Sequence, residues 1–169
     1  VEAVRDALGP TGLIRVDANG GWDVDDAVVA IGALDRAAGG LEYVEQPVMA
    51  VEDLAVVRRR VDVPIAADES IRKADDPLHV VRAGAADVAV LKVAPLGGVA
   101  RMLDIAAQID IPIVVSSALD TAVGIGRGLL AAAALPALHH ACGLGTGGLF
   151  VEDVAEPVSL GDGTLPVAP

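Results

Sequence analysis

The sequence contains very little cysteine and few aromatic residues. Cys142 is the single cysteine among 169 residues, which excludes an intrachain disulfide framework and indicates a reducing compartment, the cytoplasm. One Trp, one Tyr and one Phe make up 2% of the chain, so Val, Ala, Leu and Ile must fill the core. The length predicts one domain over residues 1–169. It falls short of a complete eight-fold barrel, for which about 250 residues are typical.

Positive charge and long apolar runs are also scarce. The chain carries 12 Lys and Arg against 24 Asp and Glu, a net charge of −12. Phosphate binding needs clustered Lys and Arg, so we expect no nucleic-acid partner. Mean hydropathy is high, at +0.56, but no apolar run approaches the roughly 20 residues that span a bilayer. No signal peptide is visible at the N-terminus. We therefore expect no membrane association and a large buried core.

What the sequence does contain is an alternation of short apolar segments with longer helical ones. The apolar segments have Val and Ile on both faces, which is typical of a parallel sheet covered by helices. Asp23 and Asp120 are predicted N-caps of the helices that follow them. Strands are predicted over 13–17, 42–45, 64–67, 87–92, 112–116 and 137–140, and helices over 23–38, 51–61, 75–83, 98–109 and 121–134. This α/β pattern fits an open doubly wound sheet or most of a barrel whose first strands are absent.

Ionisable residues follow four of these apolar segments. Asp17, Glu45, Asp68 and Lys92 are 28, 23 and 24 residues apart, which is one strand–helix unit at each step. In a parallel sheet they would gather at the carboxyl edge, where α/β folds place their active sites. Three carboxylates would repel one another there unless a cation held them. Hard oxygen ligands suit Mg²⁺, and Lys92 would be a general base or a fixed positive charge.

Four motifs carry a family resemblance. VDANGGW, VEQP, ADES and LKVAPLGG, in this order and spacing, resemble the muconate-lactonizing subgroup of the enolase superfamily over residues 10–155. Members have a modified (β/α)₈ barrel behind an N-terminal capping domain. The resemblance implies a partial barrel of about strands three to eight, without the capping domain and the first two strands. It implies that Asp17, Glu45 and Asp68 bind Mg²⁺, with Mn²⁺ as a possible substitute, and that Lys92 is catalytic.

Within this subgroup, LKVAPLGG, SSALDT and HHACGLGTGGLF resemble the o-succinylbenzoate synthase family. That resemblance implies a hydro-lyase of menaquinone biosynthesis, which catalyses the syn-dehydration of the β-hydroxy acid SHCHC to o-succinylbenzoate. Groups at the last two motifs hold the succinyl carboxylate in that family. The resemblance thus makes Ser116, Ser117, Gly143 and Gly145 substrate-binding residues, because hydroxyls and backbone amides donate hydrogen bonds to carboxylates.

Two further residues lie next to the predicted metal ligands. Asn19 is two residues past Asp17 and could support the metal site as a donor, or form a turn with the glycines that follow it. Glu69 follows Asp68 and could orient Lys92 or another cation, or serve as an acid in the first turn of a helix. His139 and His140 have no second cluster at ligand spacing, so packing or surface roles are favoured.

One element of the family pattern is missing. The family has a Lys-x-Lys at the end of the second strand, and its second lysine is the acid/base. That motif would lie roughly 25 to 30 residues before Asp17, but none of the residues before Asp17 is a lysine. We therefore expect that this chain is a fragment of a longer protein, or that it needs a second polypeptide to complete the barrel. A barrel without two strands has two open edges, so we expect association with the missing N-terminal portion or with itself.

Two other functions stay open. The first is an N-succinylamino acid racemase or a dipeptide epimerase of the same subgroup, which would use the same metal site with two opposed lysines on a small-molecule carboxylate. The second is a non-catalytic α/β domain that binds a partner or a small anion and has no metal dependence.

Overall fold

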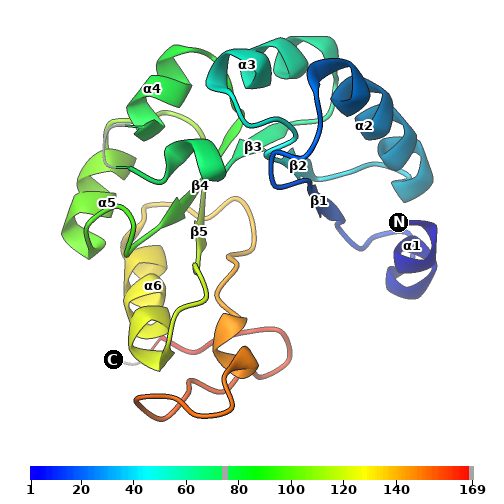
Figure 1. The fold of residues 1–169 in the computed structure, drawn as a ribbon. Helices are drawn as coiled ribbons and strands as arrows, with labels where there is room; N and C mark the ends of the chain where they lie inside the picture. Colours follow the sequence, from blue (N-terminus) through cyan, green and yellow to red (C-terminus); the bar gives the residue numbers. More distant parts are fainter. Residues whose placement is uncertain (74–75, 168–169) are drawn as a thin grey trace. The chain divides into compact units, whose positions relative to one another are not determined.

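The computed structural model describes residues 1–73 and 76–167, and strands alternate with helices along this chain (Figure 1). The strands are β1 (Arg15–Asp17), β2 (Tyr43–Glu45), β3 (Ile65–Ala67), β4 (Val88–Lys92) and β5 (Ile113–Ser116). The helices are α1 (Glu2–Leu8), α2 (Val24–Ala38), α3 (Val51–Arg60), α4 (Asp76–Arg82), α5 (Val99–Ala106) and α6 (Ala122–Ala134), with the short 3₁₀ helices η1 (Glu69–Ile71) and η2 (Thr146–Leu149).

The five strands form one sheet in the order β1-β2-β3-β4-β5. The pairs β1–β2, β2–β3 and β3–β4 are parallel, so the chain crosses back through a helix after each of these strands. Every residue of β3 and β4 is buried. Burial on both faces is the property of a helix-covered parallel sheet, and it explains why these segments are apolar up to Lys92, the last residue of β4.

The chain divides into two compact units. The first comprises Val1–Ile71 and His79–Ala89, and the second comprises Arg72–Leu78 and Val90–Pro169. Both α4 and β4 contribute residues to each unit. That residues 1–169 form a single domain stays a prediction.

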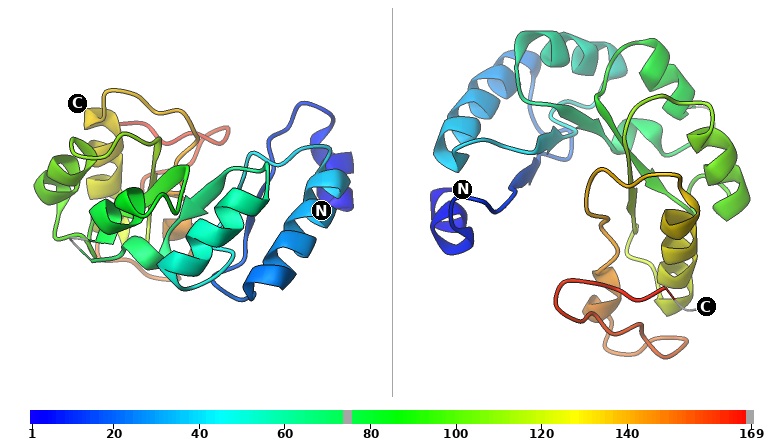
Figure 2. Two further views of the ribbon diagram at one scale, coloured as in Figure 1. Left: turned by 90° about the horizontal axis from the view of Figure 1, so that it is seen from above. Right: turned by 180° about the vertical axis from the view of Figure 1, so that it is seen from behind.

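The core of the first unit lies between β1–β3 and the helices α2 and α3, which pack side by side (Figures 1 and 2). Ile31 of α2 and Leu54 of α3 are both almost fully buried. At the end of α3, the Arg58 guanidinium donates to Oδ1 of Asp87 at 2.8 Å. Oδ2 of Asp87 in turn accepts the backbone N–H of Ile65 at 2.9 Å. This ion pair therefore links the end of α3 to the start of β3.

The predicted ends of α2 are confirmed. Oδ1 of Asp23 accepts the backbone N–H of Asp26 at 2.8 Å, and Gly39 ends the helix with φ +65°. Helix α1, in contrast, is absent from the sequence-based prediction. None of its residues is buried, and its apolar side chains at helical spacing, Val4 and Leu8, are exposed. Its Arg5 donates to the carbonyls of Gly9 and Gly12, both at 2.7 Å, which holds the following turn.

The second unit differs from the prediction at its last strand. Residues 137–140 form no strand and are mostly exposed. They therefore have no face to bury, which removes the packing that stabilises an isolated apolar segment. Instead, Gly143 forms a parallel bridge with Ser116. The segment after Gly143 lies close to α6, because a Cβ on Gly128 would lie 2.6 Å from Cδ2 of Leu144.

The predicted cap of α6 is also wrong, although the helix begins within one residue of its predicted start. Asp120 does not cap this helix: its Oδ2 accepts the N–H of Ala118 at 3.1 Å. Thr121 occupies the N-cap position without a side-chain cap. The N–H of Ala122 is bound at 2.8 Å by Oδ2 of Asp153, from 31 residues along the chain. Among the other helix bounds, α5 ends at Ala106 rather than at 109, and the predicted start of α4 at 75 lies outside the described residues.

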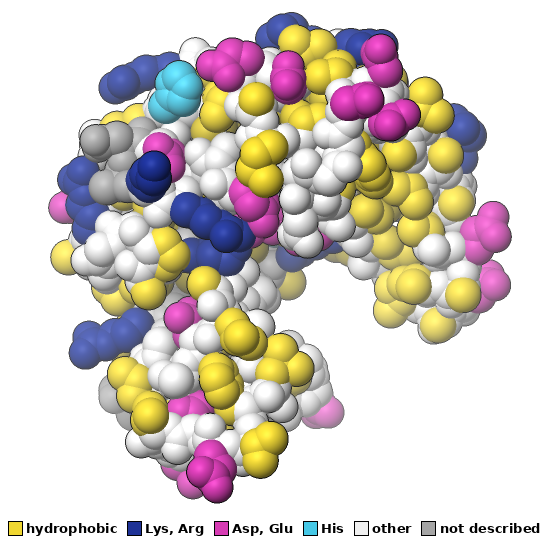
Figure 3. All heavy atoms as spheres, in the orientation of Figure 1, with side chains coloured by type: hydrophobic (Ala, Val, Ile, Leu, Met, Phe, Trp, Pro, Cys, Tyr) yellow, Lys and Arg dark blue, Asp and Glu magenta, His cyan; other side chains and the backbone are white. Residues whose placement is uncertain are grey.

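Surface charge is mixed on α3. The first turn of this helix carries Glu52 and Asp53, and the last turn carries Arg58–Arg60. Figure 3 shows acidic and basic side chains interspersed over this part of the surface. In residues 1–73 and 76–167, no helix has the length and apolar character needed to cross a membrane.

Candidate active-site residues

The first unit brings the predicted carboxylates to one edge of the sheet. Asp17 and Glu45 are the last residues of β1 and β2 and are direct register partners. Partners in a parallel pair point to the same face of the sheet. Asp68 follows the last residue of β3 directly, and β3 pairs in parallel with β2. The three predicted metal ligands therefore stand at the carboxyl ends of three neighbouring strands.

Their surroundings range from solvent to core. Asp17 is exposed and Glu45 is half-buried, whereas Asp68 is only 3% exposed. Carboxylates kept inside proteins are paired or coordinate a metal, because an isolated buried charge is strongly disfavoured. The donor set of three carboxylates is the one that Mg²⁺ prefers, so these residues fit a divalent metal by their chemistry.

The side chains are not gathered into a finished metal cluster. Among the residues that the structure describes, no three His, Cys, Asp or Glu side chains are placed to hold a metal ion. Both carboxylate oxygens of Asp17 accept hydrogen bonds from Asn19 instead. Binding would require rearrangement of carboxylates that already stand at the same edge.

Asn19 connects two of the predicted site residues. Its backbone N–H donates to Oδ1 of Asp17 at 2.9 Å, and its Nδ2 donates to Oδ2 of Asp17 at 2.6 Å. The same Nδ2 also lies 3.5 Å from Oε1 of Glu69, which begins η1. Asn19 has φ +46° and lies in a turn, and its amide donates to the Asp17 carboxylate. That it supports a metal site stays a prediction.

The loops after β1 and β2 are joined by backbone hydrogen bonds. The N–H of Gly20 donates to the carbonyl of Gln46 at 2.7 Å, and the N–H of Trp22 donates to the carbonyl of Pro47 at 3.2 Å. The backbone at Gly20 favours glycine. It has φ +70°, and a Cβ there would lie 2.6 Å from Cε of Met49. The loop that carries Asp17 is therefore held against the loop that follows Glu45.

Gln46 is a residue of this region that the sequence analysis does not single out. It is completely buried, and its Oε1 accepts the N–H of Asp68 at 2.9 Å. Nε2 of Gln46 donates to the carbonyl of Val48 at 2.8 Å. The available signal was a lone amide between Glu45 and a proline in an otherwise apolar stretch.

Lys92 and the predicted substrate-binding residues belong to the second unit. Lys92 ends β4 and is 7% exposed. The structure brings Gly143 next to Ser116 and Ser117, and Gly143 forms a parallel bridge with Ser116. The N–H of Gly143 donates to the carbonyl of Val115, and the carbonyl of Gly143 accepts the N–H of Ser117, both at 2.9 Å.

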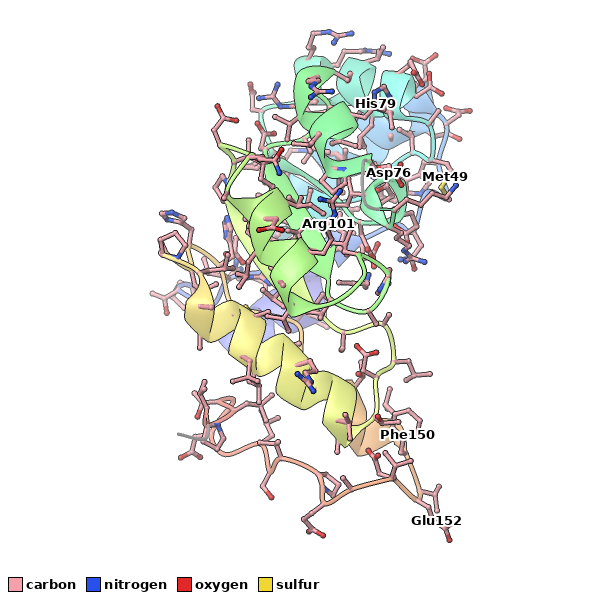
Figure 4. The ribbon with its side chains drawn as sticks, turned by 90° about the vertical axis from the view of Figure 1, so that its left-hand side faces the viewer. Met49, Asp76, His79, Arg101, Phe150 and Glu152 are labelled. Carbon is pink, nitrogen blue, oxygen red and sulfur yellow. The ribbon has the colours of Figure 1, made fainter. Side chains whose placement is uncertain are left out.

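The two serines differ in what their hydroxyls do. The Ser117 hydroxyl is 3.0 Å from the carbonyl of Gly143 and 2.8 Å from Oγ1 of Thr146, so it already has two partners. The Ser116 hydroxyl has only a long contact of 3.4 Å to the carbonyl of Ser117. Gly145 is exposed and precedes η2. Figure 4 shows the segment after η2, where Glu152 points away from the ribbon.

The two histidines considered in the sequence, His139 and His140, lie in the segment that follows α6. His139 is exposed and His140 is half-buried. No metal cluster of His, Cys, Asp or Glu side chains includes them in the described part of the chain. A role in packing or at the surface remains the interpretation that fits both.

The chain is similar to several characterised proteins. The family model described as enolase C-terminal domain-like matches residues 1–169. The o-succinylbenzoate synthase of Mycolicibacterium smegmatis is 75% identical over 169 residues, which are 100% of this chain and 51% of that protein. The o-succinylbenzoate synthase of Mycobacterium tuberculosis is 68% identical over 168 residues, 99% of this chain and 50% of that protein. The chain thus spans about half the length of these relatives.

Solved structures of the muconate-lactonizing subgroup are also similar. The muconate cycloisomerase of Pseudomonas fluorescens has a TM-score of 0.88 and 31% identity, and the match covers 99% of this chain and 48% of that chain. The L-Ala-D/L-Glu epimerase of Bacillus subtilis has a TM-score of 0.82 and 29% identity, over 89% of this chain and 43% of that chain. This likeness confirms the predicted fold class, the C-terminal part of an enolase-type α/β barrel.

Proposed function

Because this chain belongs to the enolase C-terminal domain-like family, we propose that it is the metal-binding half of an o-succinylbenzoate synthase. The observation that carries the proposal is the 75% identity to such a synthase across all 169 residues. The reaction proposed is the dehydration of SHCHC, a small carboxylate, in the menaquinone pathway. We place it in the cytoplasm, in association with the N-terminal portion that full-length relatives contain.

Asp17, Glu45 and Asp68 are the proposed ligands of a divalent metal, Mg²⁺ or Mn²⁺. Bound there, a divalent metal supplies stabilisation of the negative charge that develops on the substrate carboxylate as the α-proton leaves, an effect of several kcal/mol. Asn19 holds both oxygens of Asp17 through its backbone N–H and its amide, and thereby orients that ligand. Such partners of metal ligands fix ligand orientation.

Lys92 is proposed to act as a fixed positive charge. A buried ammonium offsets negative charge on a substrate more strongly than an exposed one, because water screens it less. The dehydration removes one proton and one hydroxide from the substrate, and together they form water. The lysine that takes the proton in the family pattern is not among the residues before Asp17, so this chain's own groups bind and stabilise charge.

The second substrate carboxylate is proposed to bind at Ser116, Ser117, Gly143 and Gly145. Ser116 is the strongest of these donors, because its hydroxyl has only one long contact to give up. The hydroxyl of Ser117 and the N–H of Gly143 already donate within the protein. Their contribution is to shape the loop and hold Ser116 in place.

The decisive experiment measures turnover of SHCHC by ultraviolet absorbance, with and without Mg²⁺, in the chain extended to the length of its relatives. We expect substrate loss that depends on the metal. Lys92→Ala should abolish turnover and leave the metal bound. Near-normal turnover of this variant would show that Lys92 is a structural residue.

Calorimetry of metal binding tests the ligand set independently of turnover. Asp68→Asn should weaken Mn²⁺ binding by more than about tenfold, since it removes a proposed ligand. Asp25→Asn is the matched control, because Asp25 lies at the surface in an ion pair with Arg60. Equal Mn²⁺ affinity in Asp68→Asn and the control would remove Asp68 from the ligand set.

A second candidate function is a dipeptide epimerase or N-succinylamino acid racemase of the same subgroup. The likeness to the L-Ala-D/L-Glu epimerase, with a TM-score of 0.82, favours it over a non-catalytic domain. Exchange of the α-proton of dipeptides or acyl amino acids with deuterium in the solvent distinguishes an epimerase or racemase from the synthase. Exchange without loss of SHCHC would replace the synthase by this alternative.

A further inference from the structure

Gln46 occupies an unusual position in the first unit. It is 0% exposed, and it follows Glu45 directly at the end of β2. Its backbone has φ +36°. This left-handed region is readily adopted by glycine, less readily by asparagine and aspartate, and is unfavourable for other residues. Such a conformation is strained and persists where the surroundings over-determine it.

The side chain of Gln46 compensates for this conformation with four hydrogen bonds. Oε1 accepts the N–H of Asp68 at 2.9 Å, the N–H of Ser70 at 3.2 Å and the hydroxyl of Ser70 at 3.1 Å. Nε2 donates to the carbonyl of Val48 at 2.8 Å. The orientation of the amide is fixed by these partners, since three donors meet one end and a carbonyl meets the other.

The backbone of Gln46 is equally engaged. Its N–H donates to the carbonyl of Ala66 in β3 at 2.8 Å, and its carbonyl accepts the N–H of Gly20 at 2.7 Å. Gln46 therefore binds the loop after β1, its own loop and the loop after β3. These are the three loops that follow the strands of Asp17, Glu45 and Asp68.

We propose that Gln46 is a positioning residue that fixes Asp68 for divalent-metal binding. The inference rests on the proposed function, because it assigns Asp68 to the metal. The N–H groups of Asp68 and Ser70 and the Ser70 hydroxyl converge on the buried Oε1 of Gln46. These bonds fix the position of the Asp68 backbone, and the backbone position limits where the Asp68 carboxylate can lie. A glycine would relieve the backbone strain at position 46 but would leave these three donors without their acceptor.

The test compares Mn²⁺ affinity, by calorimetry, in the chain and in its variants at a temperature where circular dichroism shows each to be folded. Gln46→Met keeps the length of the side chain and removes the acceptor, and we expect Mn²⁺ binding to weaken about tenfold or more. Gln46→Glu keeps an oxygen acceptor for the Asp68 N–H, and we expect it to restore most of the affinity. Ser70→Ala is the matched control. This substitution removes the hydroxyl donor to Oε1 of Gln46 and leaves the hydrogen bond from the Asp68 N–H. Its Mn²⁺ affinity should therefore stay within about threefold of the parent, a smaller change than the roughly tenfold loss expected when a positioning partner is removed.

The outcomes separate this inference from the proposed function. If the parent chain binds Mn²⁺ and Gln46→Met binds it equally well, the positioning role is overturned and the proposed function is not. Equal weakening in Gln46→Glu and Gln46→Met would also overturn it, because the acceptor would then not be the cause. No Mn²⁺ binding in the parent chain would overturn the proposed function and this inference together.

Amide hydrogen exchange of the parent chain tests the inference without any variant. The Asp68 N–H should exchange as slowly as the N–H groups of β3, because its acceptor is a buried oxygen. Exchange at the rate of an open loop would overturn the proposal even if Gln46→Met does not fold.

Discussion

Helix α2 of the first unit and helix α6 of the second both follow an aspartate, but the two aspartates act differently. The Asp23 side chain, at the N-cap of α2, accepts the N–H of Asp26, three residues on. The Asp120 side chain instead accepts the N–H of Ala118, and the N–H of Ala122 at the start of α6 is bound by Asp153, 31 residues after Ala122. The first helix is closed by its own sequence. The second is closed by the segment that follows η2, which is mostly exposed.

The polar groups at the strand ends are held over similar separations along the chain in both units. In the first unit, Gln46 is completely buried and joins neighbouring loops. In the second unit, Ser117 joins the end of β5 to Gly143 and Thr146, far along the chain. The Gln46 side chain reaches donors 22 and 24 residues away, and the Ser117 hydroxyl reaches partners 26 and 29 residues away. The two units therefore differ in their helix caps and not in the reach of these contacts. The following changes test this difference, from the largest effect to the smallest.

A leucine substitution in each unit should separate buried from exposed packing. Leu54 of α3 is 0% exposed and Leu130 of α6 is 49% exposed. Leu54→Ala should lower the free energy of unfolding by about 2 to 5 kcal/mol, because it removes buried methyl groups and leaves a cavity. Leu130→Ala should change it by less than about 0.5 kcal/mol. Urea unfolding measures both, and a loss at Leu130 as large as at Leu54 would show that the surface of α6 is packed.

High pH should destabilise the first unit through Tyr43. Burial is the largest cause that raises the pKa of Tyr43, to about 12, from an ordinary value near 10. Because the folded state holds the proton more tightly, this contribution to stability is fully present below pH 10 and is lost as the pH rises through 12. The loss is on the order of 2 kcal/mol. Urea unfolding from pH 9 to 12 should show a smaller decline in Tyr43→Phe than in the parent chain, and equal declines would contradict the assignment.

The two helix caps should differ in where their loss is felt. Asp153→Ala and Asp23→Ala should each cost about 1 kcal/mol, since each leaves an N–H at a helix start without its acceptor. Asp153→Ala should in addition speed hydrogen exchange in the segment after η2, because the cap is also what ties that segment to α6. Asp23→Ala should speed exchange only in the first turn of α2. Faster exchange confined to the start of α6 in Asp153→Ala would contradict the tie.

Much of the fold could be predicted because its signals are local. All five strands lie within their predicted ranges, since apolar runs bounded by turns mark buried strands. Asp23 and Gly39 mark both ends of α2. Helix α1 escaped prediction because it buries none of its residues, and the strand predicted over 137–140 failed because that segment is largely exposed.

The candidate site divides in the same way. The strand-end position of Asp17 and Glu45 is confirmed by their register, but their roles, like those of Asp68, Lys92 and the serines, stay proposals. Gln46 could not be assigned from the sequence, because its importance lies in which N–H groups reach its oxygen. Those donors come from residues 22 and 24 positions away.

Local patterns in the chain predicted the five strands, the helices α2 to α6, the placement of ionisable residues after apolar runs, and the Asp23 cap that reaches only three residues. These depend on local periodicity and on contacts within one turn of chain. Three contacts depend on the folded chain. Gln46 accepts the N–H of Asp68, Asp153 rather than Asp120 accepts the N–H of Ala122, and the Ser117 hydroxyl has two close partners where that of Ser116 has one long contact. The reason is that a hydrogen bond is fixed by the distance between two atoms in space, and the spacing of two residues along a chain does not specify that distance.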